Sequence, residues 1–141
     1  MEIMNDSLVR NGTYGALWLD GELVAECYGL QLKASKTKET INRCRQIVEG
    51  KKLTSVALTG TIRIYNASSI LIEKEAAAIK AGRDLRHTII SDLSDPDNPN
   101  NQRISVSGVS FDDLTLADWE AAKTGTIEAP FTAESYDVID S

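Results

Sequence analysis

The chain has 141 residues, a formal net charge of -6 and 42% hydrophobic residues, which suits one globular domain that needs no disulfide framework. Its acidic balance argues against a protein that wraps nucleic acid, because such proteins carry an excess of Lys and Arg. One His and two Cys are too few for a zinc finger or ribbon, and no G-x-S-x-G motif supports a catalytic triad. We therefore expect no metal, no cofactor and no catalytic residue.

Residues 1–13 are polar and predict a loose N-terminal arm. They lack the apolar centre of a signal peptide, and no stretch of the chain reaches the roughly 18 apolar residues of a membrane span. We expect a protein without a membrane anchor that folds in a cytoplasm-like compartment. Cys27 and Cys44 could pair, but the absence of a secretion signal favours two buried free thiols.

A β-hairpin is predicted at Asp20-Gly21, because these residues separate two apolar runs and tolerate the positive φ angles of a type I′ turn. Its second strand continues to about Ala34. Residues 35–53 lose the apolar alternation and predict a long polar loop between strands. Seven bases and two acids fall between residues 33 and 52, so this loop is strongly basic.

The clearest strand pattern covers residues 55–65, where apolar and polar side chains alternate. Gly60 within it indicates a bend or a close backbone approach. Residues 67–82 predict an amphipathic helix that is capped by Ser68 or Ser69 and stops at Gly82. We expect this helix to cover one face of a sheet.

Residues 85–93 predict a buried strand that carries the single histidine, His87. The Asp- and Asn-rich segment that follows, residues 92–102, predicts a loop. This loop superficially resembles a calcium-binding loop, but it lacks the central Gly and closing Glu of an EF-hand. We expect no calcium site there.

Two further strands are predicted in the C-terminal third. Residues 103–114 alternate with a one-residue slip at Gly108, which indicates a β-bulge. Residues 124–137 predict the last strand, and Pro130 within it requires an edge position or a break. Residues 116–123 fit a short helical turn or an irregular edge equally well.

Together these segments predict a mainly β protein, an antiparallel β-sandwich or barrel of about six strands with one flanking α-helix. Its charge is segregated, since residues 94–141 carry 10 acids and 2 bases, opposite in sign to the basic segment at 33–52. Long strands with small polar faces leave open edges that invite pairing with another chain. The pattern therefore favours a self-assembling protein.

Five segments, in order, resemble a known family. They are residues 12–26, Lys36-Thr37-Lys38, Gly50-Lys51-Lys52, Thr59-Gly60-Thr61 and the closing segment from Ala129 to Val138. By their order and spacing over nearly all of residues 12–138, the chain resembles the tail tube proteins of contractile phage tails and phage-tail-like bacteriocins, the XkdM-like family.

The resemblance implies a β-barrel-like sandwich with a flanking helix, a fold also seen in the type VI secretion tube protein. Such subunits form six-membered rings whose strands join into one inner barrel, and the rings stack into a hollow tube. A contractile sheath drives the tube through the target envelope. Implied partners are other copies of the chain, the sheath protein, the tape-measure protein and baseplate proteins, with DNA only in transit in a true phage. The particle would be assembled in the bacterial cytoplasm.

The resemblance also suggests roles for two groups of residues. The polar outward faces would line a wet lumen that does not hold a polyanion: Gln31, Lys33, Ser55, Thr59, Thr61, Arg63, Ser105, Ser107, Glu128 and Thr132. The bases of the 35–53 loop would meet acids of the adjacent ring: Lys36, Lys38, Arg43, Arg45, Lys51 and Lys52.

The alternative is a small β-barrel of the oligonucleotide-binding type that uses the basic 33–52 segment. Such modules stack bases on aromatic side chains, and only Tyr28 and Tyr65 offer a plausible pair. An enzyme has less support. The adjacent carboxylates Asp112 and Asp113 would point to opposite faces of a strand and would not form a dyad.

Overall fold

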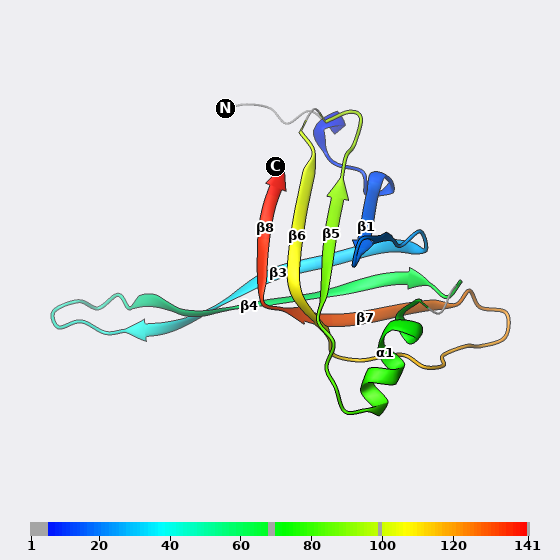
Figure 1. The fold of residues 1–141 in the computed structure, drawn as a ribbon. Helices are drawn as coiled ribbons and strands as arrows, with labels where there is room; N and C mark the ends of the chain where they lie inside the picture. The colour runs from blue at the N-terminus through cyan, green and yellow to red at the C-terminus, as the bar shows by residue number, and fades with distance from the viewer. Residues whose placement is uncertain (1–5, 68–69, 99, 141) are drawn as a thin grey trace.

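The computed structural model describes residues 6–67, 70–98 and 100–140 and consists mainly of antiparallel strands with one α-helix (Figure 1), which confirms the predicted fold class. The two short 3-10 turns are η1 (Asp6–Leu8) and η2 (Gly12–Tyr14), and the helix is α1 (Ile70–Lys80). The strands are β1 (Gly15–Leu19), β2 (Glu22–Leu23), β3 (Cys27–Ile41), β4 (Gly50–Tyr65), β5 (His87–Leu93), β6 (Gln102–Phe111), β7 (Thr126–Ala133) and β8 (Ser135–Asp140).

The strands form two layers that share β6. Sheet A has the order β2-β1-β5-β6-β8, and sheet B has the order β6-β7-β4-β3. In Figure 1 the strands β1, β5, β6 and β8 run side by side and cross β3, β4 and β7 at a steep angle. The hydrophobic core draws on both layers and on α1: Leu17, Leu19, Val24, Ile62, Ile64, Leu71, Ile89, Val106, Val109, Ala129 and Phe131.

β6 passes from sheet A to sheet B at a corner around Gly108. This glycine has a φ of 66°, and β6 gains one extra residue against β5 here, which confirms the predicted bulge. The last strand turns beside it, where the Glu134 N–H donates to the Ser107 carbonyl at 3.1 Å. The single strand predicted at 124–137 is therefore two strands, β7 and β8.

The edge or break predicted at Pro130 is confirmed on the β6 side of β7, where the ladder stops, while the strand itself continues to Ala133. β7 is an interior strand of sheet B, but its ladder with β6 ends at the pair of Phe111 and Phe131. The Pro130 carbonyl accepts from the Asp112 N–H at 2.9 Å, one position beyond the last ladder pair. The missing N–H of Pro130 therefore falls where the β6–β7 ladder has already ended.

Two local glycine predictions are confirmed. Asp20 and Gly21 have φ angles of 53° and 85° and connect β1 to β2 as a tight hairpin. At Gly60 an added Cβ would lie 2.3 Å from the Gln31 carbonyl oxygen and 2.5 Å from the Phe131 ring. At Gly60, therefore, β4 passes so close to β3 and to the core that no side chain would fit.

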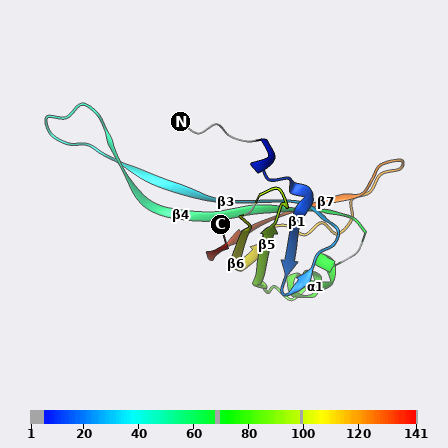
Figure 2. The same ribbon diagram turned by 90° about the horizontal axis from the view of Figure 1, so that it is seen from above.

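The long hairpin of β3 and β4 departs most from the predicted structure. β3 continues to Ile41 and β4 begins at Gly50, so the loop predicted at 35–53 is wrong at both ends and only residues 42–49 connect the strands. β7 pairs with β4 only from Leu58 onward. The far half of the hairpin therefore has two strands without a third, and it projects from the body of the protein (Figure 2).

The N-terminal arm is attached where it is described. The Asn11 N–H donates to Asp95 at 2.8 Å, and the Asn98 side chain donates to the Leu8 carbonyl at 2.9 Å. The prediction of a loose arm is wrong for residues 6–13, and its first five residues lie outside the described structure, as do the predicted helix caps Ser68 and Ser69.

Candidate self-assembly surfaces

Sheet B turns one polar face to the solvent. Directly paired residues of neighbouring strands share a face, and the pairs across β3, β4 and β7 place small polar and charged side chains together. The opposite face carries core residues such as Ile62 and Phe131. Seven predicted lumen residues lie on the polar face: Gln31, Lys33, Thr59, Thr61, Arg63, Glu128 and Thr132.

Charge on this polar face is partly compensated. Arg63 Nε lies 4.0 Å from Glu128 Oε1, with 39% and 68% of the two side chains exposed. A pair so open to water adds well under about 1 kcal/mol to stability, but it offsets the charge of Arg63 locally. Lys33 makes no ion pair with any described residue. The face is therefore mainly neutral and polar, with one uncompensated base.

The other three predicted lumen residues lie elsewhere. Ser55 continues the alternation of β4, but it lies beyond the last β7 pair, on the projecting hairpin. Ser105 and Ser107 belong to sheet A, where they pair with β8. Because their neighbour Val106 fills the core from that layer, these two serines do not share the polar face of sheet B. Their assignment to the lumen stays a prediction that this face of sheet B does not support.

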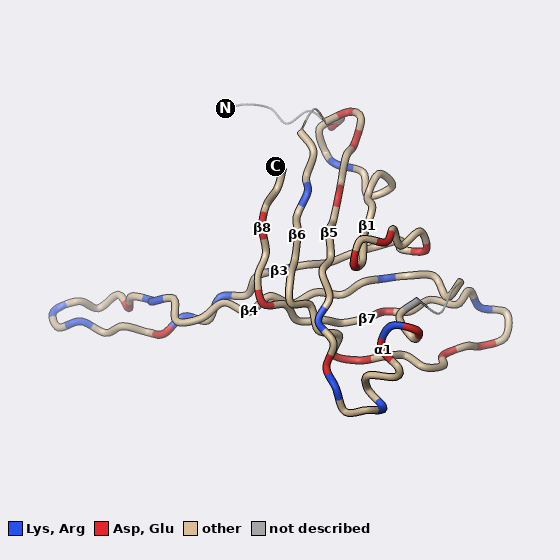
Figure 3. Tube along the Cα trace, in the orientation of Figure 1, with Lys and Arg blue, Asp and Glu red and all other residues tan. Residues whose placement is uncertain are grey.

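The six predicted inter-ring bases all lie on the long hairpin. Lys36 and Lys38 belong to β3, Lys51 and Lys52 to β4, and Arg43 and Arg45 to the connection. All six are exposed, and Figure 3 shows blue segments along this hairpin up to its tip. Lys51 Nζ donates to Thr40 at 2.7 Å. The structure therefore brings the bases together on a two-stranded arm instead of on a loop.

Three strands leave an edge without a partner in the described structure: the two-residue strand β2 and the longer strands β3 and β8. β3 pairs only with β4 along its 15 residues, and β8 pairs only with β6. β8 also exposes Tyr136, Val138 and Ile139 by about half each. Unpaired strand edges of this length are a template for pairing with another chain.

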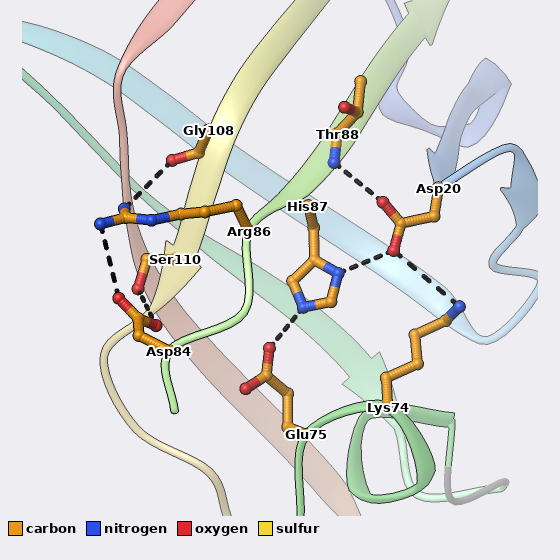
Figure 4. Close-up of polar contacts among 9 residues, drawn as sticks. All are labelled: Asp20, Lys74, Glu75, Asp84, Arg86, His87, Thr88, Gly108 and Ser110. Carbon is orange, nitrogen blue, oxygen red and sulfur yellow. Dashed lines mark hydrogen bonds and ion pairs between the residues drawn. The ribbon is translucent and has the colours of Figure 1, made fainter. Parts of the chain in front are cut away.

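A buried polar cluster joins three elements around His87 (Figure 4). Its Nδ1 lies 2.7 Å from Asp20 Oδ2 in the β1–β2 turn, and its Nε2 contacts Glu75 Oε1 of α1. His87 and Glu75 are 6% and 4% exposed. Lys74 Nζ lies 3.9 Å from Asp20 Oδ2. His87 is the strand histidine that was predicted, but no local pattern indicated its partners, because they are 67 and 12 residues away.

The same cluster keeps Asp20 ionised. Burial acts to raise the pKa of this carboxyl, but the Thr88 N–H, the His87 ring and the Lys74 charge together hold the pKa below its usual value of 3.8. The Thr88 N–H donates to Asp20 Oδ1 at 3.0 Å. Asp20 therefore acts as a fixed anion that connects the β1–β2 turn to the start of β5.

Two further predictions concern the cysteines and tyrosines. Cys27 is a half-buried free thiol, whereas Cys44 is exposed at the hairpin tip, so the prediction of two buried thiols is wrong for Cys44. The rings of Tyr28 and Tyr65 pack on each other with centroids 4.6 Å apart. Each ring uses one side for this contact, and 45% of Tyr28 and 47% of Tyr65 stay exposed. Among the described residues, no helix is long and apolar enough to span a membrane.

Comparison with known proteins identifies the family. The chain belongs to the phage tail tube protein family, whose pattern it matches over residues 2–140. It is 30% identical over 133 residues to the phage-like element PBSX protein XkdM of Bacillus subtilis (strain 168), an alignment that covers 91% of this chain and 88% of that protein. The uncharacterised protein YqbM of the same strain shows the same identity and coverage.

Solved structures share the fold at low sequence identity. A chain in the sheath–tube complex of the extracellular contractile injection system PVC, in its extended state, superposes with a TM-score of 0.70 at 12% identity, covering 92% of this chain and 90% of that one. A chain in the anti-feeding prophage cap gives 0.68 at 12% identity, with 100% and 95% covered. A chain of the gene transfer agent virion gives 0.63 at 9% identity, with 94% and 99% covered.

Proposed function

We propose that this protein is the structural subunit of the inner tube of a contractile phage tail or phage-tail-like particle. Six copies form a ring, the rings stack into a hollow tube, and sheath contraction drives the tube through a target envelope. The observation that carries the proposal is membership of the phage tail tube family over nearly the whole chain. The free edges of β3 and β8 support it, because ring closure would give unpaired strands a partner.

The polar face of sheet B is proposed as the wall of the lumen. Its side chains are mostly neutral and polar. Among the described residues of this face, only one base, Lys33, is not compensated by an acid, so the face has little affinity for phosphate. Such a wall lets a polyanion pass without retaining it. In this proposal the lumen residues are Gln31, Lys33, Thr59, Thr61, Arg63, Glu128 and Thr132, with Ser55 on the hairpin that extends the wall.

The proposed partners follow from the particle. Similar folds occur in structures described as a sheath–tube complex and as a baseplate, which supports contacts with a sheath protein and baseplate proteins. We assign the lumen to a tape-measure protein during assembly, with DNA in transit only in a true phage. Assembly takes place in the bacterial cytoplasm, and the subunit has a structural and not an enzymatic role.

Electron microscopy of the purified protein tests the proposal. At high concentration we expect six-fold rings and hollow tubes in negative stain. A monodisperse monomer at every protein concentration and ionic strength would overturn it. Micrographs of the native particle then show whether a head is attached to the tail, which separates a phage from a headless particle.

The alternative function, an oligonucleotide-binding barrel, is less well supported. The basic segment on which it relied is mostly a two-stranded hairpin and not a flexible loop, and Tyr28 and Tyr65 are the aromatic pair it would have to use.

A further inference from the structure

The tip of the long hairpin presents apolar side chains to water. Ile47 is 99% exposed and Val48 is 75% exposed, and both lie in the connection between β3 and β4. Arg43 and Arg45 precede them and are exposed as well. These two apolar side chains lie near bases at the end of a projecting hairpin. They have no role in the fold of their own subunit, since the core is formed without them.

A groove of about 700 Å³ lies at the other end of the same hairpin. It is bounded by the start of β3, by β1 and by the end of β5, and its walls are mostly apolar: Leu17, Leu23, Ala25, Cys27, Leu30 and Leu93. Leu23 on its rim is 56% exposed. The groove is thus large and apolar enough to receive branched aliphatic side chains.

The tip cannot reach the groove of its own chain. β3 starts at the groove, and after 15 residues, roughly 45 Å of strand, it ends at the tip. The ladder with β4 runs the whole way, so the hairpin does not fold back (Figure 2). A tip that enters such a groove must therefore come from a second copy.

The acids around the groove outnumber the bases there. Asp92 and Arg63 both line it, and Asp20, Glu22 and Glu26 lie beside it. Lys74 Nζ lies 3.9 Å from Asp20 and 3.8 Å from Glu22, and Arg103 lies 3.1 Å from Asp92, so part of this charge is compensated within the subunit. The segment 33–52 has an excess of bases, opposite in sign to the remaining acidic charge. Figure 3 shows red segments around the β1–β2 turn and blue segments on the distant hairpin.

We propose that Ile47 and Val48 of one subunit insert into this groove of a second copy in the adjacent ring, where Arg43 and Arg45 face Glu22 and Glu26. The inference rests on the proposed tube function and adds the acceptor surface to it. Tip and groove are different patches, so the contact is heterologous and repeats from ring to ring without closing. Each ring would be held to the next through six such insertions.

Cross-linking of assembled tubes tests this contact. The variant Ala25→Cys/Cys27→Ser has one thiol on the groove rim and the native Cys44 at the tip. The serine hydroxyl introduced by Cys27→Ser can replace the Sγ–H donation to the Gly29 carbonyl. With a short bismaleimide linker we expect a covalent ladder that extends beyond six subunits. Links within one ring would stop at six.

Two controls make the cross-link specific. Adding Cys44→Ser removes the thiol at the tip and should abolish the ladder. A variant that carries Thr132→Cys, on the polar face of sheet B, in place of Ala25→Cys should give no ladder. Tubes that are intact in micrographs but give no ladder, or a ladder that ends at six, would overturn the inference while leaving the tube function standing. Absence of tubes in the unmodified protein would instead overturn the function itself.

Substitution at the tip gives a second readout. Ile47→Asp/Val48→Asp should leave rings but reduce tube formation at least tenfold at equal protein concentration. Gln46→Asp adds one charge at the same tip without removing apolar surface, so it should reduce tube formation far less. Equal tube formation by the double variant and the unmodified protein would contradict insertion of the tip.

Discussion

His87 contacts a carboxylate at each ring nitrogen, and a neutral imidazole donates from only one of them. The imidazole ring of His87 therefore links the Asp20 and Glu75 carboxyl groups across the cluster. The contact holds α1, the β1–β2 turn and β5 together through polar groups, in addition to the hydrophobic core.

We predict that His87→Ala lowers the free energy of unfolding by about 3 kcal/mol, because it leaves the buried Glu75 carboxylate without a partner. Glu75→Gln should cost only about 1 kcal/mol, since the amide can donate to a neutral ring. Urea unfolding of both variants at neutral pH measures the difference. Equal losses in the two variants would mean that His87 acts through packing and not through its partners.

The pKa of Asp20 gives a prediction on acid stability. Its folded-state pKa is below the ordinary value of 3.8, so the ionised form is favoured by folding. This contribution is present above pH 3.8 and is lost as the pH falls through the lower, folded-state pKa. Asp20→Asn should therefore be less stable than the unmodified protein at pH 6, and the difference should shrink towards pH 3.

Urea unfolding at a series of pH values between these limits, at constant ionic strength, checks the prediction. Glu22→Gln is the matched control, because Glu22 is an exposed acid beside the same turn. A difference between Asp20→Asn and the unmodified protein that is constant with pH would contradict it.

At the scale of elements, the long hairpin decides how subunits meet. Its outer half has no third strand, and its bases are exposed. Beyond Leu58 no third strand of the described structure pairs with it, so its side chains can contact a neighbouring subunit without a cost to the folding of their own subunit. Substitutions there should change assembly and leave the stability of the isolated subunit nearly unchanged.

We predict that Arg43→Glu/Arg45→Glu impairs the stacking of rings more than their closure. The reversed charges would face the acids of the next subunit and repel them. Negative-stain microscopy should show single rings where the unmodified protein forms tubes, and Arg43→Lys/Arg45→Lys should restore tubes because it keeps the charge. Unchanged tube formation by the reversed variant would reject the inter-ring role of the hairpin.

The elements that face the core could be predicted from the sequence. The turn at Asp20-Gly21, the alternation in β4 and the bulge at Gly108 each follow from a local requirement on φ or burial. The outer half of the hairpin could not, since both its faces are in water and no apolar period marks it. The corner at Glu134 was not predictable either, because its cause is the passage of β6 between two sheets.

The candidate site was only partly predictable, for a related reason. Alternation assigns a residue to one side of its own strand, which sufficed for Thr59 and Thr61 on β4. It does not say which layer the strand joins, so Ser107 of sheet A was grouped with residues of sheet B. The His87 cluster and the groove arise only from tertiary contacts.

On the scale of the whole molecule, the tip of the long hairpin lies apart from the other features proposed for assembly. The groove shares Arg63 with the polar face of sheet B and the start of β3 with the free edge of that strand, whereas the tip belongs to neither. Tip substitutions can therefore alter ring stacking without altering the surfaces proposed for ring closure. This separation allows the hairpin variants to be assayed against intact rings.

The placement of tip and groove at opposite ends of β3 also gives a tube direction. A stack built from such contacts exposes six unfilled grooves on its first ring and six free tips on its last, or the reverse. The two terminal rings thus offer chemically different surfaces for growth. A protein that starts the stack and a protein that stops it must then recognise different parts of this chain. The one that binds the unfilled grooves must supply apolar side chains, and the one that binds the free tips must supply an apolar groove.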